Sequence, residues 1–171
     1  MKTICIAGYS GSGKTTLIEK LVPILVKEGL RVSLIKHAHH DFDVDHPGKD
    51  SYRHRQAGCM EVLVGSSRRW ALMHELRGEQ EPSVAELLQR LSACDLVIVE
   101  GFKHEAIPKI EVHRAAAGAP SLHPADPHVV AVATDEPLDT SLPQIALDDP
   151  HAVAAFIRDH LGLARPRMAA A

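Results

Sequence analysis

The sequence has few cysteines and no long apolar run. Its three cysteines, Cys5, Cys59 and Cys94, lie far apart, which gives no support to a disulfide framework or a zinc knuckle and predicts buried, reduced thiols. No apolar run approaches the ~18 residues of a membrane span, and the first residues lack the pattern of a signal peptide. We therefore expect a cytoplasmic protein without a membrane segment.

The sequence also has no excess of positive charge. The chain has 19 Lys and Arg against 22 Asp and Glu, a formal net charge of −3, so it lacks the basic surplus that a nucleic-acid partner requires. We expect no nucleic-acid binding. With 45% apolar residues in 171, the chain can build one ordinary hydrophobic core. We predict a single domain over residues 1–163 and a disordered tail at 164–171.

Apolar patterning alternates along the chain between strand and helix periodicity. Strands are predicted at 3–7, 31–35, 61–64, 70–74, 96–99, 109–113 and 129–133, and helices at 15–28, 51–57, 83–91 and 150–161. This alternation predicts an α/β layered fold with a largely parallel sheet. Antiparallel additions to the sheet are expected around Gly65 and around Phe102 to Pro108.

A glycine-rich segment joins the first strand to the first helix. It reads Gly8-Tyr9-Ser10-Gly11-Ser12-Gly13-Lys14-Thr15 and matches G-x-x-x-x-G-K-[ST] in full. Glycines let successive N–H groups turn inward, and the helix N-terminus adds partial positive charge, so the segment is predicted to bind phosphates. A turn that serves only as a helix entry is the alternative. The match indicates a fold of the P-loop NTPase type.

Individual roles follow from the chemistry of this loop. Lys14 is expected to reach the β and γ phosphates and to act in catalysis, and the Thr15 hydroxyl is expected to be a ligand of Mg²⁺. The predicted nucleotide-binding residues of the loop are Gly8, Ser10, Gly11, Ser12, Gly13, Lys14, Thr15 and Thr16.

A carboxylate follows the apolar run 96–99. Glu100 and Gly101 stand at the carboxyl end of that predicted strand, where ligands of open α/β sheets bind. Glu100 is predicted to hold Mg²⁺, and the Gly101 N–H to approach the γ-phosphate as a switch. A glutamate at a strand end also occurs without any such role, so this interpretation depends on the P-loop.

The region 36–50 has no periodicity and is rich in possible metal ligands, namely His37, His39, His40, Asp41, Asp43, Asp45 and His46. A calcium loop is rejected, because His46 and Tyr52 stand where that loop needs Gly and Glu. The leading interpretation is a switch segment in which Asp43 or Asp41 acts on the attacking water, with Asp43 also a candidate metal ligand. A zinc or nickel site is the alternative. Further candidates for phosphate contacts, or for plain solvated charge, are Lys36, Lys49, Arg53 and Arg55.

Three segments together resemble one protein family. They are the P-loop, the stretch from Ile35 to Arg53, and Val99-Glu100-Gly101-Phe102-Lys103 followed by Pro108-Lys109-Ile110-Glu111. Over about residues 1 to 160 the chain resembles the molybdopterin-guanine dinucleotide biosynthesis adapter proteins, the MobB family. A P-loop alone is shared by a very large superfamily, whereas the His and Asp loop combined with Glu-Gly-Phe-Lys is far more particular.

The resemblance implies a GTP-binding protein with weak GTPase activity. It further implies a homodimer that works beside the molybdenum cofactor guanylyltransferase, the enzyme that attaches GMP to molybdopterin. GTP follows from the resemblance alone, because the guanine-reading sequence Asn-Lys-x-Asp is absent. Asp135 is the candidate base reader, since a carboxylate can accept both guanine N1–H and N2–H, although a plain turn there needs no ligand. Two other classes stay open: a nickel- or zinc-handling metallochaperone GTPase, and a small-molecule P-loop kinase or ligase.

Overall fold

The computed structural model describes residues 1–38 and 42–164 and divides into two compact units. The larger unit comprises Met1–His37 and the chain from Glu86 onward, and the smaller comprises Ala38–Ala85. Each unit is described by itself. A single domain over residues 1–163 stays a prediction, and all but the first residue of the predicted tail lies outside the described residues.

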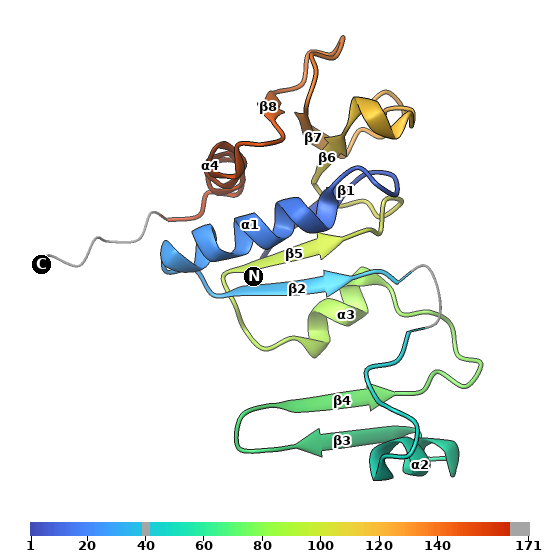
Figure 1. Ribbon diagram of the computed structural model, residues 1–171. Coiled ribbons are helices and arrows are strands. Elements are labelled where there is room, and N and C mark those ends of the chain that lie inside the picture. The colour runs from blue at the N-terminus through green and yellow to red at the C-terminus, as the bar shows by residue number, and fades with distance from the viewer. Residues whose placement is uncertain (39–41, 165–171) are drawn as a thin grey trace, which may run out of the picture. The chain divides into compact units, whose positions relative to one another are not determined.

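The larger unit is built on six strands in the order β2-β5-β1-β6-β7-β8, and every neighbouring pair is parallel (Figure 1). The strands are β1 (Lys2–Ala7), β2 (Val32–Lys36), β5 (Leu96–Glu100), β6 (Lys109–His113), β7 (Val129–Thr134) and β8 (Gln144–Ala146). The predicted parallel sheet is therefore confirmed. The sequence did not predict β8, because three residues are too few to show a period.

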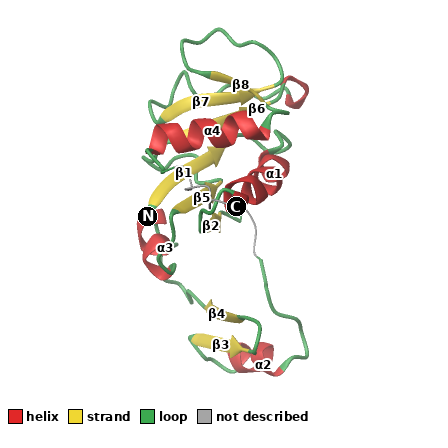
Figure 2. Ribbon diagram, turned by 90° about the vertical axis from the view of Figure 1, so that its left-hand side faces the viewer, coloured by secondary structure: helices red, strands yellow, loops and turns green. Residues whose placement is uncertain are grey.

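The central strand β5 is buried, and two helices pack on the sheet beside it. All five residues of β5 are buried, as expected for a central strand of a parallel sheet. The helices α1 (Lys14–Lys27) and α4 (Pro150–Leu161) pack against each other and against β1 (Figure 2). In α1 the buried residues recur three and four positions apart, so one face of the helix enters the core: Leu17, Ile18, Leu21 and Leu25.

Local signals fix the ends of α4. The Asp149 carboxylate accepts the Ala152 N–H at 2.9 Å, and Pro150 occupies the first helical turn, where its missing N–H costs nothing. Gly162, at φ 61°, ends the helix in the left-handed conformation. The predicted boundaries of this helix are confirmed.

The smaller unit contains α2 (Asp50–Gln56) and an antiparallel hairpin of β3 (Glu61–Gly65) and β4 (Trp70–His74). A backbone hydrogen bond of 2.8 Å from Ser66 N–H to the Arg69 carbonyl closes the hairpin. The antiparallel pair expected around Gly65 is therefore confirmed. Helix α3 (Val84–Arg90) begins at the end of this unit and leads to β5.

The antiparallel pair expected around Phe102 to Pro108 is wrong. The flanking strands β5 and β6 both run parallel to β1, one on each side of it. Glu100 ends β5 at the level of Ile6, and Lys109 begins β6 at the level of Cys5, one residue back along β1. A short loop therefore suffices to join two parallel strands here, and no reversal of the chain into a hairpin takes place.

The cysteines only partly match the expectation. Cys5 and Cys94 are buried, but Cys59, which follows α2 in the smaller unit, is exposed, so the prediction was wrong for that thiol. Burial raises the pKa of Cys5 to about 12. Within residues 1–38 and 42–164, no helix combines the length and the apolar character that a bilayer span requires.

Candidate nucleotide-binding site

The P-loop curls at the carboxyl end of β1 and leads directly into α1. Gly13 has a φ of 98°, and Gly8 a φ of 148°, both in the region that side chains avoid. A Cβ on Gly8 would lie 2.5 Å from the Val112 carbonyl oxygen, so the loop fits against β6 only with glycine at this position. The hydroxyl of Ser12 is buried in the loop and has no hydrogen-bond partner within the described part of the chain.

The Lys14 side chain folds back over this loop. Its Nζ donates hydrogen bonds of 2.8 Å to the carbonyl oxygens of Gly8 and Tyr9. Burial lowers the pKa of Lys14; the Glu100 carboxylate opposes this shift, while the ammonium groups of Lys36 and Lys103 add to it. Within the described residues, the hydrogen-bond acceptors of the Lys14 ammonium are neutral carbonyl oxygens, which are weaker partners than a charged phosphate oxygen.

Thr15 and Glu100, the two residues predicted to hold Mg²⁺, are in direct contact. The Thr15 hydroxyl donates a hydrogen bond of 2.6 Å to Glu100 Oε1. Glu100 is only 5% exposed and ends β5, the neighbour of β1 in the sheet. These are hard oxygen donors, the type that Mg²⁺ prefers, and they lie beside the phosphate loop, so the pair fits this cation.

The carboxylate of Glu100 has a second partner. Lys36 Nζ lies 3.2 Å from both Glu100 oxygens. Lys36 ends β2 and is in register with Glu100 across the parallel pair β2–β5, which places both side chains at the same edge of the sheet. Sequence reasoning named Lys36 only as one of four basic residues, because the adjacency of β2 and β5 is not visible in the sequence.

Beyond Glu100 the backbone is tightly turned. Gly101 has a φ of 90°, and a Cβ there would lie 2.9 Å from the His37 Cβ. Phe102 also has a positive φ, 42°, and its ring centroid lies 4.6 Å from that of the His37 imidazole, with the two rings tilted by 40°. The Gly101 N–H faces the Ile6 carbonyl oxygen at 3.4 Å, a long and weak contact. Glycine is therefore required here, and its N–H is weakly engaged.

The other side of the P-loop faces residues that follow β6 and β7. The guanidinium of Arg114 lies 3.3 Å from the place that a Cβ on Gly13 would take. Asp135, directly after β7, accepts the Ala115 N–H at 2.9 Å through Oδ1, and its Oδ2 lies 3.6 Å from Arg114. The structure thus brings the candidate base reader to the same sheet edge as the P-loop. Arg114 was not predicted from the sequence, although its place just after a strand end was a usable signal.

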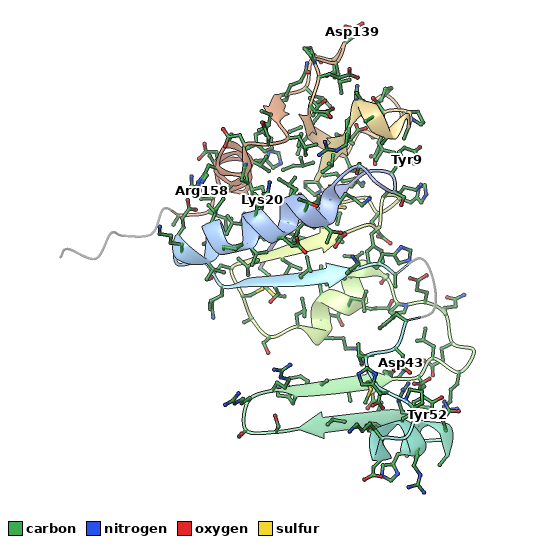
Figure 3. The ribbon with its side chains drawn as sticks, viewed as in Figure 1. Tyr9, Lys20, Asp43, Tyr52, Asp139 and Arg158 are labelled. Carbon is green, nitrogen blue, oxygen red and sulfur yellow. The ribbon has the colours of Figure 1, made fainter. Side chains whose placement is uncertain are left out.

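The smaller unit holds the remaining candidates. Asp43 accepts two hydrogen bonds from Arg55, at 2.9 and 2.7 Å, and the Asp45 N–H at 2.8 Å. The bond from Arg55 lowers the pKa of Asp43. Arg55 is buried and also pairs with Glu75 at 2.6 Å, so its guanidinium binds carboxylates within the smaller unit. Figure 3 shows Asp43 and Tyr52 in this unit, and the Arg55 guanidinium lies 5.4 Å from the Tyr52 ring centroid.

The roles predicted for the His and Asp loop stay predictions. Asp41, His39 and His40 lie outside the described residues. Among the residues that are described, no three His, Cys, Asp or Glu side chains come together to hold a metal ion. The catalytic and metal-binding roles of Asp43 are likewise untested by its contacts.

Comparison with known proteins adds to this geometry. The family described as molybdopterin guanine dinucleotide synthesis protein B, MobB, matches residues 3–135. The chain belongs to the MobB family. The molybdopterin-guanine dinucleotide biosynthesis adapter protein of Escherichia coli K12 is 47% identical over 157 residues, covering 90% of each chain. That of Haemophilus influenzae is 45% identical over 158 residues, covering 91% of this chain and 87% of the relative.

Solved structures of the family share the fold. A crystal structure of molybdopterin-guanine biosynthesis protein B has a TM-score of 0.76 at 30% identity and covers 94% of this chain and 99% of its own. A MobB homologue from Bacillus stearothermophilus has a TM-score of 0.73 at 26% identity and covers 96% of this chain and all of its own. The resemblance stated from the sequence is therefore confirmed.

Proposed function

We propose that this protein is a GTP-binding adapter in molybdenum cofactor biosynthesis that assists the attachment of GMP to molybdopterin. Membership of the MobB family supports the pathway, and the two relatives above are named as adapter proteins of molybdopterin-guanine dinucleotide biosynthesis. The partner is the molybdenum cofactor guanylyltransferase, in the cytoplasm. Hydrolysis of GTP is slow in the absence of that partner.

One observation carries the nucleotide part of this proposal. Burial lowers the pKa of Lys14; the Glu100 carboxylate opposes this shift, and the nearby ammonium groups of Lys36 and Lys103 add to it, so three lysines gather around one buried carboxylate. Such a surplus of positive charge beside an N–H-lined loop is stabilised by a multiply charged anion. A triphosphate satisfies this requirement, with Lys14 turning from the carbonyls of its own loop to phosphate oxygens.

Magnesium is the second part of the proposal. Thr15 and Glu100 are the residues that would hold it, and when bound it would offset the negative charge of the phosphates. The Gly101 N–H, weakly engaged with Ile6, donates to the terminal phosphate in the triphosphate state. For hydrolysis, Asp43 or Asp41 orients the attacking water.

Asp135 supports guanine as the base. Its Oδ1 is held by the Ala115 N–H, while Oδ2 faces Arg114 beyond hydrogen-bonding distance. The carboxylate is therefore fixed in direction and keeps acceptor capacity for the N1–H and N2–H of guanine. Adenine has no donor at these two positions, so the same carboxylate disfavours ATP.

A homodimer is supported by the hairpin of the smaller unit. Leu63 and Trp70 are 64% and 66% exposed, and Leu63 pairs directly with Leu72 on the same face of the hairpin. An isolated two-stranded sheet is marginally stable, and an exposed apolar face on it favours association. A second copy of the chain covers this face in the proposed dimer, which the molar mass in solution tests by light scattering.

The decisive experiment compares GTP with ATP by isothermal titration in the presence of Mg²⁺, with Lys14→Ala as the matched variant. GTP is expected to bind, ATP to bind at least ~10-fold more weakly, and Lys14→Ala to lose binding while it keeps its circular dichroism spectrum. Full affinity in Lys14→Ala, or a preference for ATP, contradicts the proposal. Tight binding of Ni²⁺ or Zn²⁺ would favour a metallochaperone, and a turnover of ~1 to 100 s⁻¹ with an acceptor would favour a kinase.

A further inference from the structure

Lys36 makes a contact that the proposed binding of Mg²⁺ cannot leave unchanged. Its Nζ lies 3.2 Å from both oxygens of Glu100, whose Oε1 also accepts the Thr15 hydroxyl. Thr15 and Glu100 are the two residues that would hold the divalent cation. The Lys36 ammonium therefore neutralises Glu100 in the absence of metal, and a cation bound there repels it.

The two partners differ in their freedom to move. Glu100 belongs to the buried strand β5, and its side chain is 7% exposed, whereas the side chain of Lys36 is 54% exposed. Lysine has a flexible four-carbon stem, so Lys36 can swing while Glu100 stays in place. When the metal site fills, Lys36 is the residue that leaves the pair.

The sheet topology limits where Lys36 can go. β5 lies between β2 and β1, so Lys36 approaches the site from the side of β2, whereas the P-loop and Lys14 approach from β1. A triphosphate seated on the P-loop, with Mg²⁺ held by Thr15 and Glu100, would bring its terminal phosphate toward this edge. That phosphate is the charged acceptor next to Glu100 that a nucleoside diphosphate lacks.

We propose that Lys36 is a second phosphate-binding lysine, which pairs with Glu100 in the empty site and moves to the terminal phosphate when a nucleoside triphosphate and its metal bind. This inference deepens the proposed function and rests on it. Lys36 thereby distinguishes the triphosphate from the diphosphate state at the end of β2, directly before the segment that leads into the smaller unit.

The test is a comparison of affinities by isothermal titration. Lys36→Met keeps the aliphatic stem and removes the ammonium; Lys20→Met, an exposed lysine on α1 labelled in Figure 3, is the matched control. The ligands are Mg²⁺ with GDP and Mg²⁺ with the non-hydrolysable β,γ-imido analogue of GTP. Loss of a charged hydrogen bond predicts ~10- to 100-fold weaker binding of the analogue in Lys36→Met and at most ~3-fold weaker binding of GDP.

A second pair of variants guards against misfolding, because Lys36→Met leaves Glu100 without its cation. The single variant Glu100→Gln is compared with the double variant that also carries Lys36→Met, both in metal-free buffer. The added loss of the ammonium is expected to reduce the preference for the triphosphate analogue over GDP. An unchanged ratio of the two affinities in both comparisons, or an equal loss for both ligands, overturns the role of Lys36. If the wild type binds neither ligand, the proposed function itself is wrong.

Discussion

The Thr15 hydroxyl donates a hydrogen bond of 2.6 Å to the carboxylate of Glu100, 85 positions away in the chain. Parallel pairing of β1 with β5 creates this contact, because it brings the end of β5 beside the loop that follows β1. Two separate sequence signals, a phosphate-loop threonine and a glutamate at a strand end, thus form one pair of oxygen donors. Substitution of either residue therefore tests whether the pair acts on the metal.

Glu100→Gln is expected to weaken the dependence of GTP binding on Mg²⁺. The substitution keeps the shape of the side chain and its bond to Thr15 but removes the charge that attracts the metal. Loss of a residue that supports a metal site typically costs roughly 10- to 100-fold in metal affinity. A titration of Mg²⁺ at fixed GTP measures this, with the exposed Glu19→Gln on α1 as control. An unchanged midpoint in Glu100→Gln would show that Glu100 does not act on the metal.

Asp135→Asn is expected to change the base that is preferred. The amide oxygen of Asn can keep the bond that the Ala115 N–H donates to Oδ1, so the amide NH₂ replaces the Oδ2 acceptor. A donor there repels the guanine N2–H but matches the carbonyl at position 2 of xanthine, while the amide oxygen can still accept the N1–H that both bases carry. We expect ~10- to 100-fold weaker GTP binding together with a gain in affinity for xanthosine triphosphate. Equal losses for both nucleotides would indicate that Asp135 only supports the loop at Ala115.

Much of this site follows from local sequence, and the remainder depends on which strands are neighbours. The P-loop and Glu100 were predictable, because each depends on a strand end and on residues beside it. The pairing of Lys36 with Glu100 was not, since it needs the order β2-β5-β1, which is set by packing of the whole sheet. The error at Phe102 to Pro108 has the same origin, because a short link between two apolar runs is typical of a hairpin.

Asp43 shows the limit of composition-based reasoning. A dense set of His and Asp residues predicted chemistry, but the pattern carried no information on which partner each side chain takes. In the structure Asp43 pairs with Arg55, a residue twelve positions later on α2, and both helix and loop are stabilised by the contact. Sequence alone treated Arg55 as a candidate phosphate contact, because burial of an arginine cannot be seen in a short polar helix.

Gly8→Ala is expected to destabilise the larger unit more than Gly11→Ala does. At Gly8 a Cβ would lie 2.5 Å from the Val112 carbonyl oxygen and 2.8 Å from the Ser12 hydroxyl, so the backbone must shift. At Gly11 no atom lies within 4 Å of the added Cβ, and only the positive φ of 78° is unfavourable. A strained position of this kind costs about 1–3 kcal/mol.

Urea unfolding followed by circular dichroism measures both variants against the wild type. The difference between the two substitutions reports the close contacts with Val112 and Ser12 together with the different backbone conformations of the two glycines. Equal midpoints for Gly8→Ala and Gly11→Ala would mean that the loop relaxes away from Val112 without loss of stability.

His74 is expected to make the smaller unit more stable at mildly acidic pH. Its Nδ1 lies 2.8 Å from Glu61 Oε1, its directly paired residue across the hairpin, and its Nε2 lies 3.6 Å from Glu79. The bond with Glu61 raises the pKa of His74. A raised pKa in the folded state means that the charged pair contributes stability fully below the unfolded value of about 6.5, and that this contribution is lost as the pH rises through the folded pKa.

An NMR titration of the His74 ring measures the pKa directly, and hydrogen exchange of the β3–β4 amides reports the stability of the hairpin at pH 6 and pH 8. Glu61→Gln is the matched variant, because it keeps the size of the side chain and removes the charge that favours the imidazolium. In that variant the pKa of His74 is expected to fall and the hairpin to lose most of its pH dependence. A His74 pKa at or below its ordinary value in the wild type, or no change in Glu61→Gln, would show that the contact with Glu61 does not hold the proton.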